Sequence, residues 1–243
     1  AFVYPFLRDY PEFLTHPRDS ILAFISEPVN QWSRFTRQKV LKVFCQFLVE
    51  EGMLEKNPAQ GIKMSMPGKT ANIPPVEEVR KFINALDVRS YSDRRLRAII
   101  LLAFDCGLRR GELCGLKQSD IDKDRLALTV CAEYSKVRKS RLVPISPSVF
   151  KELKNFISII PKEWNTPWLF PSNNGQKLDP SNLGLQMRRV AQKVGYDLKL
   201  HGLRHLCATE FLRKSGNIVL VSRLLGHSSI RATADTYEHL NFN

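Results

Sequence analysis

The final third of the chain carries basic side chains and one tyrosine in a fixed order. The motif His201-Gly-Leu-Arg-His205 comes first, Leu224-Leu-Gly-His227 follows it, and Tyr237 stands ten residues beyond His227. Imidazole and guanidinium groups donate hydrogen bonds to phosphate oxygens, and a phenol becomes a nucleophile once it has lost its proton. The arrangement is therefore suited to holding a phosphodiester while a tyrosine attacks its phosphorus.

Such an attack makes three chemical demands. The phosphorane transition state gains negative charge on its non-bridging oxygens, the phenol must lose a proton whose ordinary pKa is about 10, and the departing 5′-oxygen must gain one. Arginine meets the first demand best, because its planar fork binds two phosphate oxygens and stays protonated. We predict this role for Arg109, at an interhelical turn, and for Arg204, at the start of the helix that His201 opens. Removing one such donor typically lowers a rate by on the order of 10²–10³.

The spacing of His201 and His205 is compatible with several roles. An i, i+4 pair is also a zinc-ligand spacing, but the intervening Gly-Leu-Arg contains no glutamate base, and the cation Arg204 would repel a divalent ion. We therefore predict no metal and expect the pair to donate to phosphate or to act as a base toward the phenol. For His205 a purely structural role is an equal alternative. His227 follows a helix-ending glycine, at a junction from which its imidazole can reach a phosphate.

Three further candidates each have a functional and a structural interpretation. Lys136 lies in a turn between two expected strands, where a flexible lysine can protonate the leaving oxygen as general acid or simply contact phosphate. Glu112 follows Arg109 by three residues, so it can orient a cation of the site or form a surface pair. Tyr237 has polar neighbours at the end of the cationic series, although a buried, hydrogen-bonded tyrosine is the commoner fate of a phenol.

Composition indicates a globular protein with a polyanionic partner. The 243 residues are 43% hydrophobic and 25% charged, and 37 basic against 24 acidic residues leave a net charge of +13. Residues 73–243 hold 28 of the basic and 17 of the acidic residues, which accounts for +11 of that excess. Nucleic acid is the usual partner of such a domain, and the alternative is a solvated basic surface without a partner.

Other features bear on the compartment. No apolar run reaches the roughly 18 residues that span a bilayer, so no membrane partner is expected. The five cysteines include no C-x-x-C pair and stand mostly among apolar neighbours, as reduced thiols do in the cytoplasm. The N-terminus carries no signal-peptide pattern. The chain begins at Ala1 without methionine, so we expect a fragment or a processed form.

The N-terminal part is expected to be a small helical unit. Residues 1–30 are weakly patterned, because four prolines break any long helix. Residues 31–52 have helical periodicity, with an apolar stripe that includes Leu41 and Phe47. The other face of this helix is basic and is expected to contact DNA through Arg34, Arg37, Lys39 and Lys42.

A linker then separates two domains. Residues 64–75 end in two prolines, and a helix start follows them directly. We therefore expect a helical domain over residues 1–68 and a second domain over residues 69–243. The second domain is expected to contain helices around residues 99–104, 111–116, 147–160, 182–194, 203–214 and 218–225, and strands at 125–131 and 140–145. The predicted fold class is mainly α with a small antiparallel β-sheet (α+β).

Four segments of the second domain follow one another in the order found in one known family. They are residues 106–113 (Cys-Gly-Leu-Arg-Arg-Gly-Glu-Leu), residues 136–144 ending in Arg-Leu-Val-Pro, residues 201–205 (His-Gly-Leu-Arg-His), and residues 224–227 (Leu-Leu-Gly-His) with 235–237 (Asp-Thr-Tyr). These resemble the first arginine box, the β-hairpin lysine segment, the H-x-x-R-H box and the terminal box of the tyrosine recombinase (phage integrase) family. Residues 43–58 also resemble the end of that family's core-binding helical domain.

The resemblance implies a role for each matched residue. Around the scissile phosphate it implies Arg109, Lys136, His201, Arg204 and His227, with Tyr237 as nucleophile and Glu112 and His205 as supporting residues. Lys136 would be the general acid, with Lys139 as its rival, because residues 135 and 137 are not the glycines usual in that hairpin. DNA contacts are expected from the basic residues nearby, Arg138, Lys139 and Arg141. No cofactor is implied, since the energy of the cleaved bond stays in the covalent link.

The implied activity is that of a site-specific DNA recombinase or integrase. It would cleave and rejoin strands through a 3′-phosphotyrosyl intermediate and a free 5′-hydroxyl. Its partners would be double-stranded DNA, further copies of itself in a homotetramer on paired sites, and an accessory DNA-bending protein, in the cytoplasm and on the nucleoid.

Alternatives remain open beside this reading. They are a type IB topoisomerase-like enzyme, a telomere resolvase, and a DNA-binding module that has lost catalysis. The complete set of cations plus a tyrosine argues against the last. The N-terminal domain is shorter than the family's usual clamp, so we expect an N-terminal piece to be missing. Six residues follow Tyr237, fewer than in many relatives whose tail docks on a neighbouring protomer.

Overall fold

The computed structural model of the protein describes residues 2–64, 72–134, 140–226 and 229–237. The chain divides into two compact units, Ala1–Lys69 and Thr70–Asn243, and each unit has a hydrophobic core of its own. None of the helices in the described ranges is long and apolar enough to cross a membrane.

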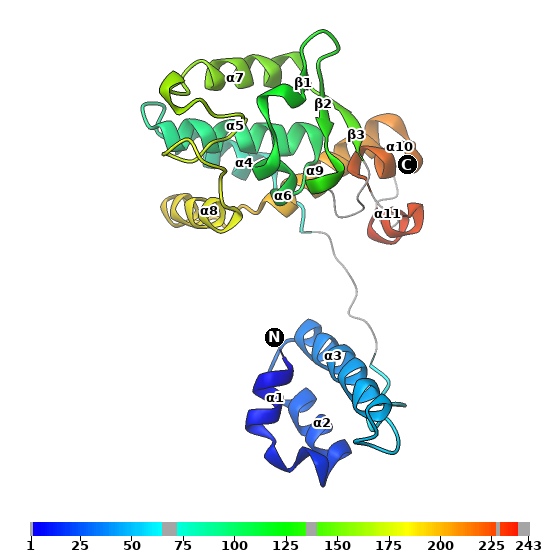
Figure 1. Cartoon of the computed structure of the whole chain (residues 1–243). Coiled ribbons are helices and arrows are strands. Elements are labelled where there is room, and N and C mark those ends of the chain that lie inside the picture. The colour runs from blue at the N-terminus through cyan, green and yellow to red at the C-terminus, as the bar shows by residue number, and fades with distance from the viewer. Residues whose placement is uncertain (1, 65–71, 135–139, 227–228, 238–243) are drawn as a thin grey trace. The chain divides into compact units, whose positions relative to one another are not determined.

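The first unit consists of short helices packed against one long helix. Its elements, coloured blue to cyan in Figure 1, are α1 (Val3–Asp9), the 3-10 helix η1 (Pro11–Leu14), α2 (Pro17–Ser26) and α3 (Gln31–Glu50). Pro11 and Pro17 stand at the first positions of η1 and α2, where a missing N–H costs no helical hydrogen bond. The stretch expected to be weakly patterned is therefore mostly helical, because its prolines begin helices.

Helix α3 buries one face in the core of this unit. The side chain of Asn30 caps its start by accepting a hydrogen bond from the N–H of Ser33 at 2.8 Å. The buried positions recur every three or four residues and are Gln38, Leu41, Cys45 and Leu48. The expected apolar stripe is wrong at Phe47, which is 51% exposed. Residue 47 lies roughly 120° round the helix from residue 41 and so leaves the buried face.

The second unit is mainly helical with one small sheet, which confirms the predicted fold class. Its α-helices are α4 (Val76–Asn84), α5 (Tyr91–Cys106), α6 (Arg110–Gly115), α7 (Pro147–Ile157), α8 (Pro180–Val194), α9 (Leu200–Ser215), α10 (Ile218–Leu225) and α11 (Ile230–Tyr237). Its 3-10 helices are η2 (Gln118–Asp120), η3 (Ala132–Tyr134) and η4 (Lys162–Trp164).

The sheet is antiparallel, with strand order β1-β2-β3. Its strands are β1 (Ile121–Asp122), β2 (Ala127–Val130) and β3 (Arg141–Pro144). In the central strand, Leu128 lies opposite Ile121 on one side and Val143 on the other. Strands β2 and β3 match the two predicted strands. The third, β1, is only two residues long, which is too short for alternation to be visible in a sequence.

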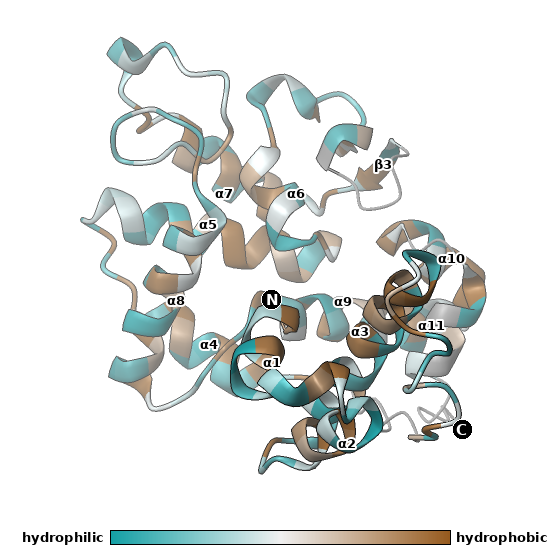
Figure 2. Cartoon of the chain, turned by 60° about the horizontal axis from the view of Figure 1, so that its bottom comes forward, coloured by the Kyte–Doolittle hydropathy of each residue, from teal (hydrophilic) through white to brown (hydrophobic). Residues whose placement is uncertain are grey.

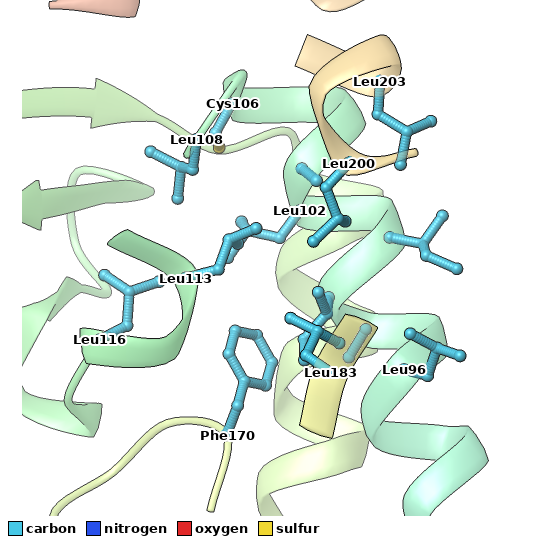
Figure 3. Close-up of a cluster of buried hydrophobic side chains, with 14 of the residues drawn as sticks. Leu96, Leu102, Cys106, Leu108, Leu113, Leu116, Phe170, Leu183, Leu200 and Leu203 are labelled. Carbon is cyan, nitrogen blue, oxygen red and sulfur yellow. The ribbon is translucent and has the colours of Figure 1, made fainter. Parts of the chain in front are cut away.

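Helix α5 is the centre of the second unit's core and is buried on most sides, because α7, α8 and α9 pack against it. Figure 3 shows Leu96 and Leu102 of α5 in the same hydrophobic cluster as Leu200 of α9 and Phe170. The helix ends at Gly107, whose φ of 62° is left-handed, and a Cβ there would lie only 2.8 Å from the side chain of Leu225. This close approach places the chain after α5 beside the end of α10.

The last three helices share a small hydrophobic cluster. In Figure 2 the ribbon of α10 is mostly brown, because most of its residues are hydrophobic. Val221 and Leu225 of α10 are buried with Leu212 of α9 and with Tyr237, the last residue of α11. This cluster holds the predicted nucleophile against the helix that carries two of the predicted histidines.

Candidate active site

Glu112 is the buried anion around which two arginines gather. Arg109 precedes α6 in an extended conformation; its N–H donates to Oε2 of Glu112 at 2.8 Å, and its Nη1 donates to Oε1 at 3.1 Å. The Glu112 side chain is fully buried, so this is not a surface pair. Burial by itself would raise the pKa of Glu112, but hydrogen bonds from Arg141 and from the Arg109 N–H outweigh it, and the pKa is lowered.

Arg141, the first residue of β3, is the second partner of this carboxylate. Its Nη1 and Nη2 donate to Oε1 and Oε2 of Glu112 at 2.9 Å each, and its Nε donates to the carbonyl of Leu224 at 3.0 Å. The Arg141 side chain is 11% exposed, which departs from the DNA-contacting position expected for it. The alternation of side chains along a strand indicates this burial, since Arg141 lies on the same face of β3 as the buried Val143.

The C-terminal end of α10 supplies carbonyl acceptors to both predicted phosphate-binding arginines. Arg204 donates through Nη1 to the carbonyl of Gly107 and through Nη2 to that of Leu225 at 2.7 Å. Arg109 donates to the carbonyls of Leu225 and Gly226 at 3.4 and 3.3 Å. The last carbonyls of a helix lack partners within it and carry the negative end of its dipole, so they attract cations. Two arginines far apart in sequence are thereby brought together.

The two arginines differ in how much of each is accessible. The side chain of Arg109 is 26% exposed, whereas Arg204 is only 3% exposed. Burial, followed by repulsion from Arg109, lowers the pKa of Arg204 to about 10, which leaves it protonated at neutral pH. Arg109 is therefore the more accessible of the two arginines.

His201, His205 and Tyr237 form a chain of hydrogen bonds from the surface to the core. Nε2 of His201 lies 3.0 Å from Nε2 of His205, and Nδ1 of His205 lies 2.7 Å from the phenolic oxygen of Tyr237. The i, i+4 spacing places both imidazoles on one face of α9. His201 is exposed, His205 is partly buried and Tyr237 is only 2% exposed.

Burial sets the protonation state of this chain. It lowers the pKa of His205 to about 4, with help from His201 and Arg204, and it lowers the pKa of His201 in the same direction. The pKa of Tyr237 is raised to about 12 by burial, although Arg204 acts the other way. At neutral pH both imidazoles are therefore uncharged and the phenol keeps its proton. A neutral His205 can accept that proton, so the pair has the arrangement of a nucleophile and its base.

The chain is similar to known proteins over most of its length. The model of the phage integrase family matches residues 75–243, which is more than half of the chain. The chain belongs to the phage integrase family, the tyrosine recombinases.

The similarity extends to individual family members. Tyrosine recombinase XerC of Alcanivorax borkumensis is 33% identical to this tyrosine recombinase over 83% of this chain and 67% of its own length. A XerC-like recombinase of Caldanaerobacter subterraneus subsp. tengcongensis is 31% identical over 82% of this chain and 60% of its own length. The chain thus spans roughly two thirds of the relatives it matches. A lambda integrase tetramer bound to a Holliday junction shares the fold, with a TM-score of 0.70 and 21% identity over 87% of this chain and 64% of that one.

Some predicted site residues of this tyrosine recombinase lie outside the described residues. They are Lys136, Arg138, Lys139 and His227. The choice between Lys136 and Lys139 as general acid therefore stays a prediction from sequence. The residues that the structure does bring together are Arg109, Glu112, Arg141, His201, Arg204, His205 and Tyr237.

The basic face predicted on α3 is only partly available to DNA. Lys39 and Lys42 are exposed, and Arg34 is partly buried. Arg37 instead donates to a carboxylate oxygen of Glu27 at 2.6 Å and lies over the ring of Phe24, 4.0 Å from its centroid. Because its guanidinium is engaged inside the first unit, Arg37 departs from the DNA-facing position expected for it.

Proposed function

We propose that Tyr237 is the nucleophile with which this tyrosine recombinase cleaves and rejoins DNA at specific sites. The hydrogen bond between its phenol and the neutral imidazole of His205 is the observation that supports this most directly. Two arginines and an exposed histidine beside the pair complete a site for an anionic substrate.

The proposed step balances as a transesterification. The Tyr237 oxygen forms a bond to phosphorus, its proton passes to Nδ1 of His205, and the bond from phosphorus to the 5′-oxygen breaks. The lysine predicted at position 136 supplies the proton that makes the 5′-hydroxyl. Arg109 and Arg204 offset the charge that develops on the non-bridging oxygens. The product holds the strand as a 3′-phosphotyrosyl ester, so reversal rejoins DNA without an outside energy source.

The buried state of Tyr237 adds a conformational requirement. In-line attack needs the phenolic oxygen about 3–3.5 Å from phosphorus. A side chain that is 2% exposed is closed to a duplex, so α11 must shift when DNA binds. A closed state of this kind would keep the nucleophile from DNA until α11 moves.

The net charge of the chain and its family indicate which partners it has. A net charge of +13 suits a duplex DNA partner. One solved family member is a tetramer on a Holliday junction, and we extend that assembly, a homotetramer on paired sites, to this chain. The helical domain of residues 1–68 would clamp the duplex, an accessory protein could bend it, and the reaction would take place in the cytoplasm at the nucleoid.

The test is covalent trapping on suicide substrates, duplexes nicked near the cleavage position so that the short 5′-hydroxyl strand diffuses away. Candidate sites come from DNA flanking the gene. Wild type should give a protein–DNA band that survives SDS, and Tyr237→Phe should give none. Tyr91→Phe is the matched control, because Tyr91 lies in the same unit and burial also raises its pKa to about 12. A covalent band that persists in Tyr237→Phe would refute the assignment.

A further inference from the structure

The carboxylate of Glu112 is shared between two arginines and has no unused oxygen. Oε1 accepts from Nη1 of Arg109 and Nη1 of Arg141, and Oε2 accepts from the Arg109 N–H and Nη2 of Arg141. The parallel two-bond geometry with Arg141 is the stronger arrangement, because both N–H groups of the fork point along the carboxylate. Arg141 is therefore the main counter-ion of Glu112.

Arg141 also contacts the helix end that holds the other arginines. Its Nε donates to the carbonyl of Leu224, and a Cβ at Gly226 would lie 3.0 Å from its Nη1. The neighbouring carbonyls of Leu225 and Gly226 are the ones that receive Arg109 and Arg204. One side chain thus ties β3 to α6 and to the end of α10.

Arg141 is less accessible to a substrate than Arg109 in this state. All three guanidinium nitrogens have protein partners, and the side chain is 11% exposed against 26% for Arg109. The donors that Arg141 directs at Glu112 and Leu224 are thus not available to a phosphate. Its effect on the reaction must therefore be exerted through the residues it contacts.

We propose that Arg141 is a positioning residue. By balancing the charge of Glu112, it leaves the positive charge of Arg109 available to the scissile phosphate. The buried carboxylate of Glu112 needs one cation to balance it. When Arg141 fills that role, Glu112 can orient Arg109 while the positive charge of Arg109 stays available to the reacting phosphate. Without Arg141, Arg109 becomes the counter-ion of Glu112, and its attraction for the developing negative charge falls. This inference rests on the proposed function, in which Arg109 binds the phosphate.

The first measurement is the rate of covalent adduct formation at saturating DNA for Arg141→Lys and Arg141→Met. Lysine keeps the charge but loses the fork, and methionine loses both. We expect the rate to fall by about a hundredfold for Arg141→Met and less for Arg141→Lys, with DNA affinity nearly unchanged. Arg95→Lys is the matched control, since Arg95 is a buried arginine of the same unit that donates to the carbonyl of Pro171. It should lose stability but keep the rate.

Two further readouts separate positioning from a general structural role. A methylphosphonate at the cleavage position removes the phosphate charge that Arg109 offsets, so the rate deficit of Arg141→Lys should shrink on that substrate. Adding Glu112→Gln to Arg141→Met removes the unbalanced carboxylate, so the double variant should cleave faster than Arg141→Met alone. A structural defect would be equal on both substrates and would worsen in the double variant, and either result would overturn the proposal.

The outcomes also separate this inference from the function it rests on. If Tyr237→Phe still forms the adduct, the nucleophile is wrong whatever Arg141 does. If Tyr237→Phe abolishes the adduct while Arg141→Lys and Arg141→Met cleave as fast as Arg95→Lys, only the role of Arg141 fails. Should Arg141→Met not fold, the ratio of rates on phosphate and methylphosphonate for Arg141→Lys decides the question alone.

Discussion

Nδ1 of His205 in α9 lies 2.7 Å from the phenolic oxygen of Tyr237 at the end of α11. The imidazole is uncharged at neutral pH, because burial holds its pKa at about 4. In the tautomer whose proton is on Nε2, the lone pair of Nδ1 faces the phenol and the Nε2–H faces His201. A proton that leaves Tyr237 then has a path to an exposed imidazole.

The first prediction concerns His205 as the base. We expect His205→Phe to slow adduct formation by about 10²–10⁴, the usual contribution of a general base. Replacing Tyr237 with a ring-fluorinated tyrosine lowers the phenol pKa, so it should restore much of the rate in that variant. His16→Phe, in the first unit, is the control. If fluorination gives no recovery, His205 is a packing residue.

Acid should destabilise the protein through the same histidine. The folded pKa of His205 is about 4 against an ordinary value of 6.5, so the unfolded chain binds its proton first as the pH falls. The stabilising contribution is complete above about pH 6.5 and is lost down to about pH 4. Urea unfolding between these limits should show wild type losing about 2 kcal/mol more than His205→Gln. Equal losses would mean that the imidazole is not buried uncharged.

Gly107 should tolerate no side chain. Alanine there would combine a left-handed φ of 62° with a Cβ at 2.8 Å from Leu225 and 3.2 Å from Cys207. We expect Gly107→Ala to cost about 2–4 kcal/mol in free energy of unfolding. Gly195→Ala is a matched control, because its φ is 71° but nothing lies within 4 Å of its Cβ. It should cost about 1 kcal/mol. Similar losses in urea unfolding would contradict the close packing.

The basic residues of α3 should divide into two classes in DNA binding. Lys39→Ala and Lys42→Ala remove exposed charges, so each should lower the slope of log affinity against log salt by about 0.9. Arg37→Gln should leave that slope unchanged and lower the thermal stability of the first unit, because Arg37 pairs with Glu27. A slope change for Arg37→Gln equal to that of the lysines would place its guanidinium on DNA after all.

Much of the site's chemistry can be predicted from local sequence. The i, i+4 spacing of His201 and His205 puts both on one helical face whatever the rest of the chain does. The i, i+3 spacing of Arg109 and Glu112 similarly places the two side chains within reach of each other. Helix α3 and strands β2 and β3 follow from periodicity, because their faces alternate between core and solvent over enough residues to be recognised.

The tertiary structure alone decided which of these groups meet. Arg141 is 29 positions from Glu112, and Tyr237 is 32 positions from His205. The burial that holds His205 neutral likewise comes from helices brought together by the small cluster around Leu225. Such contacts depend on how the ends of helices pack around one core. Periodicity in the sequence indicates only which face of each element is buried. That is why the sequence predicts the reacting groups and leaves two roles open for the histidines, while the fold decides that His205 contacts the phenol and that Arg141 pairs with Glu112.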